Sequence, residues 1–102
     1  MEGWIKLYRS LKEWQWYSDI NVSRLFIHLL LSASFVTTKW QDIVINRGQC
    51  IVGRESLSRE TGLSEQQVRT ALKKLQKSEE ITTKATNKYT IITITKFDRY
   101  QG

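Results

Sequence analysis

The sequence has no proline, one cysteine and no long apolar run. The single cysteine, Cys50, excludes an internal disulfide and a thiolate-rich zinc site, and it fits a reducing, cytoplasmic setting. The longest apolar stretch, residues 25–31, is interrupted by His28 and is shorter than the roughly 18 residues of a membrane span. The first residues, Met-Glu-Gly-Trp, have neither a basic start nor an apolar run, so we expect no secretion signal.

Catalytic and metal-binding patterns are missing as well. The chain has no Ser/His/Asp set, no paired carboxylates and no phosphate-binding glycine loop, so we expect no enzyme. His28 has no carboxylate or cysteine at ligand spacing, and Cys50 has no basic neighbour, so both are expected to pack inside the domain. We therefore expect neither a metal ion nor a cofactor.

Positive charge is present and unevenly placed. The net charge is +6 over 102 residues, and residues 66–96 hold +5 of it, with seven Lys/Arg against the two carboxylates Glu79 and Glu80. A basic surface concentrated in one helix and one hairpin indicates a polyanionic partner, although a high pI by itself serves solubility equally well.

Two helices are predicted in the first third of a single domain that spans residues 1–102. Apolar side chains at helical spacing predict an N-terminal helix over residues 1–18. A second helix over residues 20–36, capped by Asn21, is apolar almost all round and should therefore be the central one. The tryptophans of the first helix could stack on bases, but packing within the domain or on another subunit is the stronger interpretation.

A first hairpin is predicted over residues 40–53, where the sequence switches to β-branched side chains. Residues 46–48 (Asn-Arg-Gly) lie between two such runs and predict its loop, with glycine in the left-handed position. Trp40 is expected to close the hairpin end of the core.

Two helices joined by a tight turn are predicted over residues 54–78. The first helix ends at Gly62, and the second is capped by Ser64, with Gln67 completing a capping box. The buried stripe of the second helix is predicted to comprise Val68, Ala71, Leu72 and Leu75.

A second hairpin is predicted over residues 80–97, whose two strands alternate in polarity and meet at Asn87-Lys88. This turn pairs Ile81 with Ile94. The face predicted to meet the core comprises Ile81, Thr83, Ala85, Ile92 and Ile94.

This order of elements predicts an α+β fold, namely a winged helix-turn-helix with an extra N-terminal helix and two β-hairpins. An α-helix fits the major groove of DNA, and only the face turned away from the core reaches base edges. The second helix of the motif offers amides, a hydroxyl and cations on that face, and the second hairpin offers lysines to phosphate. The predicted DNA-binding residues are Arg54, Ser64, Gln66, Gln67, Arg69, Thr70, Lys73, Lys74, Lys77, Lys84 and Lys88.

Residues 64–81, "SEQQVRTALKKLQKSEEI", resemble the recognition helix of GntR-type winged-helix repressors. The resemblance implies that the arginine matching Arg69 contacts DNA. Two positions depart from that family, which often has arginine where this chain has Glu55 and Glu65.

A longer resemblance covers nearly the whole chain. The opening "GWIK" and the stretches "RGQ" (residues 47–49) and "FDRY" (residues 97–100) are similar to the N-terminal winged-helix domain of DnaD-like replication proteins of phages, prophages and mobile elements. This resemblance implies a role in replication initiation or the primosome, with double-stranded DNA and a helicase or its loader as partners. Such proteins usually continue into a linker and a second domain, so the chain is either an isolated domain or the first arm of a larger initiator.

Self-association is the alternative function, because the matching domain of the DnaD-like group is implicated in oligomerisation. A homodimer would use the aromatic side of the first helix. The residues predicted for that surface are Trp4, Leu7, Leu11 and Trp14. A small transcriptional regulator is a third alternative.

Overall fold

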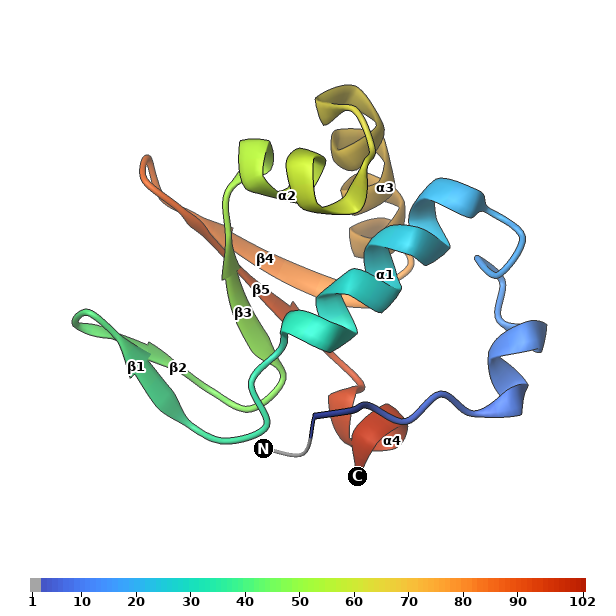
Figure 1. Ribbon diagram of the computed structural model, residues 1–102, viewed down its shortest axis with the longest axis horizontal. Coiled ribbons are helices and arrows are strands. Elements are labelled where there is room, and N and C mark those ends of the chain that lie inside the picture. The colour runs from blue at the N-terminus through green and yellow to red at the C-terminus, as the bar shows by residue number, and fades with distance from the viewer. Residues whose placement is uncertain (1–2) are drawn as a thin grey trace.

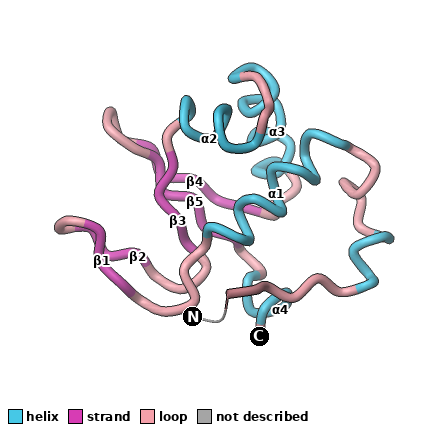
Figure 2. Tube along the Cα trace, in the orientation of Figure 1, coloured by secondary structure: helices cyan, strands magenta, loops and turns pink. Residues whose placement is uncertain are grey.

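The core is built around α1 (Ile20–Ser32), as its apolar character on more than one side predicts. A computed structural model describes residues 3–102, and in it Leu25, Phe26 and Leu29 of this helix are completely buried. The elements are arranged as Figures 1 and 2 show. In chain order they are η1 (Arg9–Glu13), α1, β1 (Thr38–Trp40), β2 (Ile43–Ile45), β3 (Gln49–Val52), α2 (Arg54–Thr61), α3 (Glu65–Lys77), β4 (Ile81–Ala85), β5 (Thr90–Ile94) and α4 (Phe97–Gln101).

The predicted N-terminal α-helix is wrong. Residues 1 and 2 lie outside the described residues, and the remainder is mostly loop with the short 3₁₀ helix η1 near its middle (Figure 2). The Trp14 indole Nε1 donates to the Glu80 carboxylate (2.7 Å), and the Trp16 Nε1 donates to the Ser78 hydroxyl (2.9 Å). Residues two apart do not share a face of an α-helix, so a helix could not turn both indoles toward the rest of the molecule.

The start of α1 is capped by Asp19 rather than by Asn21. The Asp19 carboxylate accepts a hydrogen bond from the Val22 N–H (3.0 Å), which satisfies one of the free donors of the first turn. The helix ends at Ser32, four residues before its predicted end. Beyond it the chain is tied into a loop, because the Ser34 N–H donates to the first carbonyl of β3 (2.9 Å).

The single hairpin predicted over residues 40–53 is replaced by two separate pairings. β1 pairs with β2 around a turn at Gln41-Asp42, whereas β3 pairs with β5. Residues 46–48 do lead into β3, but Gly48 (φ +84°) packs directly against Phe97. This contact holds the loop against α4 instead of leaving it as the exposed tip of a hairpin.

The three-stranded antiparallel sheet has the order β3-β5-β4 and lies below α2 and to the left of α1 in Figure 1. The register predicted for the second hairpin is confirmed, because Ile81 pairs with Ile94 and Thr86 donates its N–H to the Tyr89 carbonyl (2.8 Å). The inward-facing isoleucines are buried. Ala85 is exposed, contrary to prediction, because β4 extends past the core near the turn.

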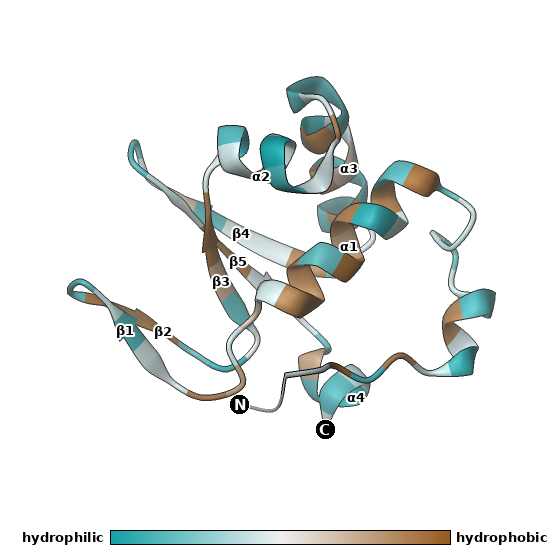
Figure 3. Cartoon of the chain, viewed as in Figure 1, coloured by the Kyte–Doolittle hydropathy of each residue, from teal (hydrophilic) through white to brown (hydrophobic). Residues whose placement is uncertain are grey.

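The helix pair α2 and α3 forms as predicted. Gly62 (φ +80°) ends α2 in the left-handed conformation. At the start of α3, Ser64 and Gln67 exchange the two hydrogen bonds of a capping box, at 2.9 and 3.1 Å. The apolar stripe of α3 turns toward α1, and Figure 3 shows hydrophilic colour over much of α2 and α3.

The short helix α4 is an element that the sequence pattern does not predict, and it joins both ends of the chain. The Lys6 N–H donates to the Gln101 side-chain oxygen (2.8 Å), and the Gln101 amide donates back to the Lys6 carbonyl (2.9 Å). The Tyr100 hydroxyl donates to Glu80 (3.0 Å), the carboxylate that also binds Trp14. Burial and the neighbouring Glu80 charge raise the pKa of Tyr100 to about 12, so the phenol stays a proton donor.

Arg47 fastens the loop before β3 to the same end of the molecule. Its Nε donates to the Asp98 carboxylate (2.7 Å), and its guanidinium lies 5.1 Å from the ring centre of Phe97 and 5.5 Å from that of Phe35. The stretches "GWIK", "RGQ" and "FDRY" therefore meet around α4. Their contacts there stabilise the fold.

Two left-handed glycines provide a matched test of this packing. An added Cβ at Gly48 would lie 2.9 Å from the Phe97 Cβ, whereas at Gly62 it would meet nothing within 4 Å. Gly62→Ala should cost about 1–2 kcal/mol of unfolding free energy from backbone strain alone. Gly48→Ala should lower the free energy of unfolding by at least ~1 kcal/mol more, because its added methyl group also collides with Phe97. Urea denaturation measures both; equal losses would show that the Gly48–Phe97 contact does not constrain the fold.

Candidate nucleic-acid interface

The orientation of α3 decides which of its side chains are exposed. Val68, Ala71 and Leu75 are buried, which confirms three residues of the predicted stripe, and Leu72 is half-buried. The opposite face is exposed and polar. It carries Gln66, Arg69, Thr70, Lys73 and Lys77.

Three of these exposed side chains form a row of hydrogen bonds. The Arg69 guanidinium donates to the Gln66 side-chain oxygen (2.9 Å), and the Gln66 amide donates to the Thr70 hydroxyl (3.3 Å). Because these bonds join residues three and four apart, they run along the helix surface. The row holds the arginine and the amide in fixed positions on the side that faces solvent.

A groove of about 360 Å³ separates α3 from the start of α2 and from the β4–β5 turn. Four predicted residues from three different elements line it, namely Arg54, Arg69, Lys73 and Lys88. We call this the basic groove. Leu57 and Val68 form part of its lining, so the cations surround a partly apolar surface.

Among the residues that the structure describes, no carboxylate forms an ion pair with the cations of the basic groove. Within residues 3–102, the three ion pairs that form are His28–Glu60 (3.2 Å), Arg47–Asp98 (2.7 Å) and Lys74–Asp19 (2.8 Å). Four exposed, uncompensated positive charges around one groove concentrate a positive potential there, which attracts an anion.

Lys74 is set apart from the other predicted cations. Its ammonium binds Asp19 on one side and lies 5.8 Å from the Trp16 ring centre on the other, which links α3 to the start of α1. This lysine therefore has a structural role. Lys77 and Lys84 are exposed but do not line the basic groove.

The other predicted polar residues at the start of α3 also lie outside the basic groove. Ser64 and Gln67 use their side-chain oxygens on each other's N–H groups in the capping box. Gln66, Gln67 and Thr70 also border a smaller hollow of about 140 Å³ beside Asp19. The structure thus brings Arg54, Arg69, Lys73 and Lys88 together in the basic groove, whereas Gln66 and Gln67 line the hollow beside Asp19.

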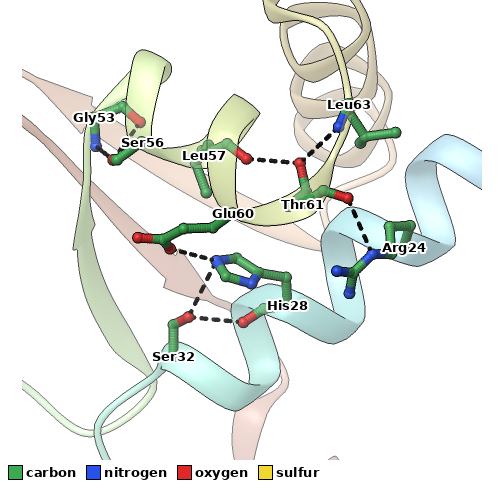
Figure 4. A network of polar contacts seen from close by, with 9 residues as sticks. All are labelled: Arg24, His28, Ser32, Gly53, Ser56, Leu57, Glu60, Thr61 and Leu63. Atoms are coloured by element: carbon green, nitrogen blue, oxygen red, sulfur yellow. Dashed lines mark hydrogen bonds and ion pairs between the residues drawn. The ribbon is translucent and has the colours of Figure 1, made fainter.

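The turn between α2 and α3 is held by a network shown in Figure 4. The Thr61 hydroxyl donates to the Leu57 carbonyl (2.6 Å) and accepts from the Leu63 N–H (3.2 Å), and Arg24 of α1 donates to the Thr61 carbonyl (3.3 Å). His28 lies next to this network with its Nε2 3.2 Å from Glu60. These contacts fix the position of α2, and with it Arg54.

Both His28 and Cys50 pack against other parts of the domain, as predicted. Cys50 is buried as predicted, and burial raises its pKa to about 12, which keeps the thiol protonated and unreactive. The His28 side chain is 16% exposed and packs between α1 and α2, with the Glu60 carboxylate beside it, a partner from another helix that sequence spacing could not reveal. Within the described residues, no cluster of three potential metal ligands occurs.

Tyr89 is a groove residue that the sequence reasoning missed. It lies beside the β4–β5 turn, lines the basic groove and contacts Trp40, with ring centres 6.2 Å apart. Trp40 does not close the core, contrary to prediction, because it is 45% exposed on the β1–β2 hairpin. The available signal was that Tyr89 directly follows the predicted Asn87-Lys88 turn.

Comparison with family models, curated proteins and solved structures finds no match to this chain. The geometry described above therefore carries the functional argument. Among the described helices, none has both the length and the apolar character needed to cross a membrane.

The Lys74–Asp19 pair predicts a pH dependence of stability. The hydrogen bond from Lys74 lowers the pKa of Asp19 below its usual 3.8, and the Val22 N–H lowers it further. The contribution of this pair is therefore fully present above about pH 4 and is lost as the pH falls through the lower, folded-state pKa. Asp19→Asn keeps a capping side chain but removes the charge. In urea denaturation its free energy of unfolding should be lower than that of the wild type by up to about 1 kcal/mol at pH 7 and by much less at pH 2.5. An equal decrease in unfolding free energy at both pH values would contradict the assignment of this pH dependence to the Lys74–Asp19 pair.

Proposed function

We propose that this chain is a DNA-binding domain of the winged-helix type. The order α1, β3, α2, α3, β4, β5 and the sheet order β3-β5-β4 support this proposal, because a winged helix uses the same succession of helices and a terminal hairpin. In this assignment α3 enters the major groove, and the β4–β5 hairpin is the wing.

The basic groove is the observation that carries the proposal. Its cations come from α2, α3 and the β4–β5 turn, and they are exposed without acidic partners among the described residues. Lys and Arg at such a surface bind DNA phosphates and release counterions, which supplies most of the affinity for DNA. Arg69 and Gln66 lie next to each other on α3, and arginine and glutamine are the side-chain types that pair with guanine and adenine.

The biological role that we propose is replication initiation. Its support is the resemblance of "GWIK", "RGQ" and "FDRY" to DnaD-like replication proteins. In that role the domain would hold DNA while a helicase or its loader is recruited.

Reversing one groove charge tests DNA binding. Lys73→Glu should weaken binding to a 20-base-pair duplex at least ten-fold in fluorescence anisotropy, because it replaces an attraction to phosphate by a repulsion. The slope of log Kd against log salt should fall by about 1 for each phosphate that the variant no longer neutralises. Lys12→Glu, on η1, changes the net charge equally and is the matched control. Equal weakening by both variants would mean that net charge, not the groove, governs binding.

Self-association is the second candidate function, and exposed aromatics favour it. Trp4, Leu7 and Tyr8 are 60%, 54% and 48% exposed, an unusual density of apolar surface in one short segment. Trp14 is removed from this surface, contrary to prediction, because its ring packs on Phe26 with ring centres 4.7 Å apart. The predicted residue Leu11 is half-buried.

Light scattering tests this second function. If the N-terminal segment forms a dimer interface, the double variant Trp4→Ser, Leu7→Ser should convert a dimer into a folded monomer, because both side chains are more than half exposed and neither is one of the buried residues of the core cluster. Val36→Ser, at another exposed apolar position, should leave the mass unchanged. A wild-type monomer at high concentration would exclude the interface.

A further inference from the structure

One aromatic pair borders the basic groove and lies outside the core. Tyr89 lines the groove, and Trp40 meets it from the β1–β2 hairpin with ring planes at 74°. In Figure 1 the β1–β2 and β4–β5 hairpins project from the same side of the molecule, and the Trp40–Tyr89 contact places them next to each other. Aromatic rings and cations thus adjoin at one site.

The fold itself does not account for Trp40. The β1–β2 hairpin has three residues in each strand, and no residue of β1 belongs to the core cluster. Such a two-stranded hairpin is marginal on its own. Trp40 is 45% exposed there, so a large part of its indole surface is accessible to a ligand.

We infer that the Trp40–Tyr89 pair stacks on unpaired bases, so that the ligand of the basic groove is DNA with a single-stranded segment. This inference rests on the proposed function and specifies its substrate. Within a duplex the faces of the bases are already stacked on each other, and only their edges are accessible. An unpaired base has a free face, and aromatic side chains next to cations are what binds it.

The geometry assigns a different part of the DNA to each part of the site. Arg54, Arg69, Lys73 and Lys88 hold the sugar-phosphate backbone in the groove. The DNA strand then leaves the groove past Tyr89 and places a base on the exposed side of the Trp40 indole. The edge-on arrangement of the two rings leaves an indole surface free for that base.

Anisotropy with three labelled DNAs tests this assignment. The probes are a blunt 20-base-pair duplex, the same duplex with a ten-thymidine tail, and a 20-thymidine single strand. The wild type should bind the tailed duplex about ten-fold tighter than the blunt one. Trp40→Ala should abolish that difference while changing blunt-duplex affinity less than two-fold, and Trp40→Phe should keep most of it.

Val44→Ala is the matched control, because Val44 is an exposed residue of the same hairpin. It should leave the tail preference intact, and circular dichroism confirms that each variant is folded. Equal affinity of the wild type for tailed and blunt duplexes, or a tail preference that survives Trp40→Ala, would overturn the inference.

The outcomes separate this inference from the proposed function. Duplex binding that depends on Lys73 but shows no tail preference removes the inference and keeps the DNA-binding function. No binding to any of the three DNAs overturns both. Tighter binding of a uridine RNA strand than of the thymidine strand would replace DNA by RNA as the ligand.

Discussion

The proposed function depends on the burial of one stripe of α3 against α1. Val68, Ala71 and Leu75 are at most 1% exposed, and α1 supplies the apolar surface that covers them. A helix that buries one stripe must expose the opposite one. The rotation of α3 about its axis is therefore set by hydrophobic packing, and Arg69 and Lys73 face the groove as a consequence.

A second set of contacts, at the other end of the molecule, keeps the hairpins in place. Gly48 fits against Phe97, Arg47 binds Asp98, and buried Glu80 accepts hydrogen bonds from Trp14 and Tyr100. Glu80 immediately precedes β4, so this polar centre positions the strand that leads to the turn of the basic groove. The stretches that resemble replication proteins thus influence the basic groove indirectly, through the fold.

The sequence predicted the parts of the fold that carry local signals. Gly62, Ser64 and Gln67 mark the ends of α2 and α3, and the two-residue turn of the second hairpin determines its register. The N-terminal helix failed because the apolar residues at helical spacing do not share one buried face. Trp14 packs on Phe26 and binds Glu80, whereas Trp4 and Leu7 stay exposed. α4 was missed because five residues are too few for a periodic pattern.

For the candidate site, the sequence predicted which basic residues are available but not which of them meet in one groove. Arg54 and Lys88 are far apart in the sequence and line one groove only after the sheet forms. Lys73 and Lys74 are neighbours with the same chemistry, yet one faces the groove and the other binds Asp19. Which lysine is free depends on what α1 brings to its side of α3, and no local pattern contains that information.

The most direct test of the central claim is a two-dimensional ¹⁵N–¹H NMR titration of the domain with duplex DNA at low salt. The account predicts that the largest amide shifts fall in residues 52–54, 68–73 and 86–90, which surround the basic groove. Shifts confined to residues 4–11 and α4, or no shifts at all, would contradict it.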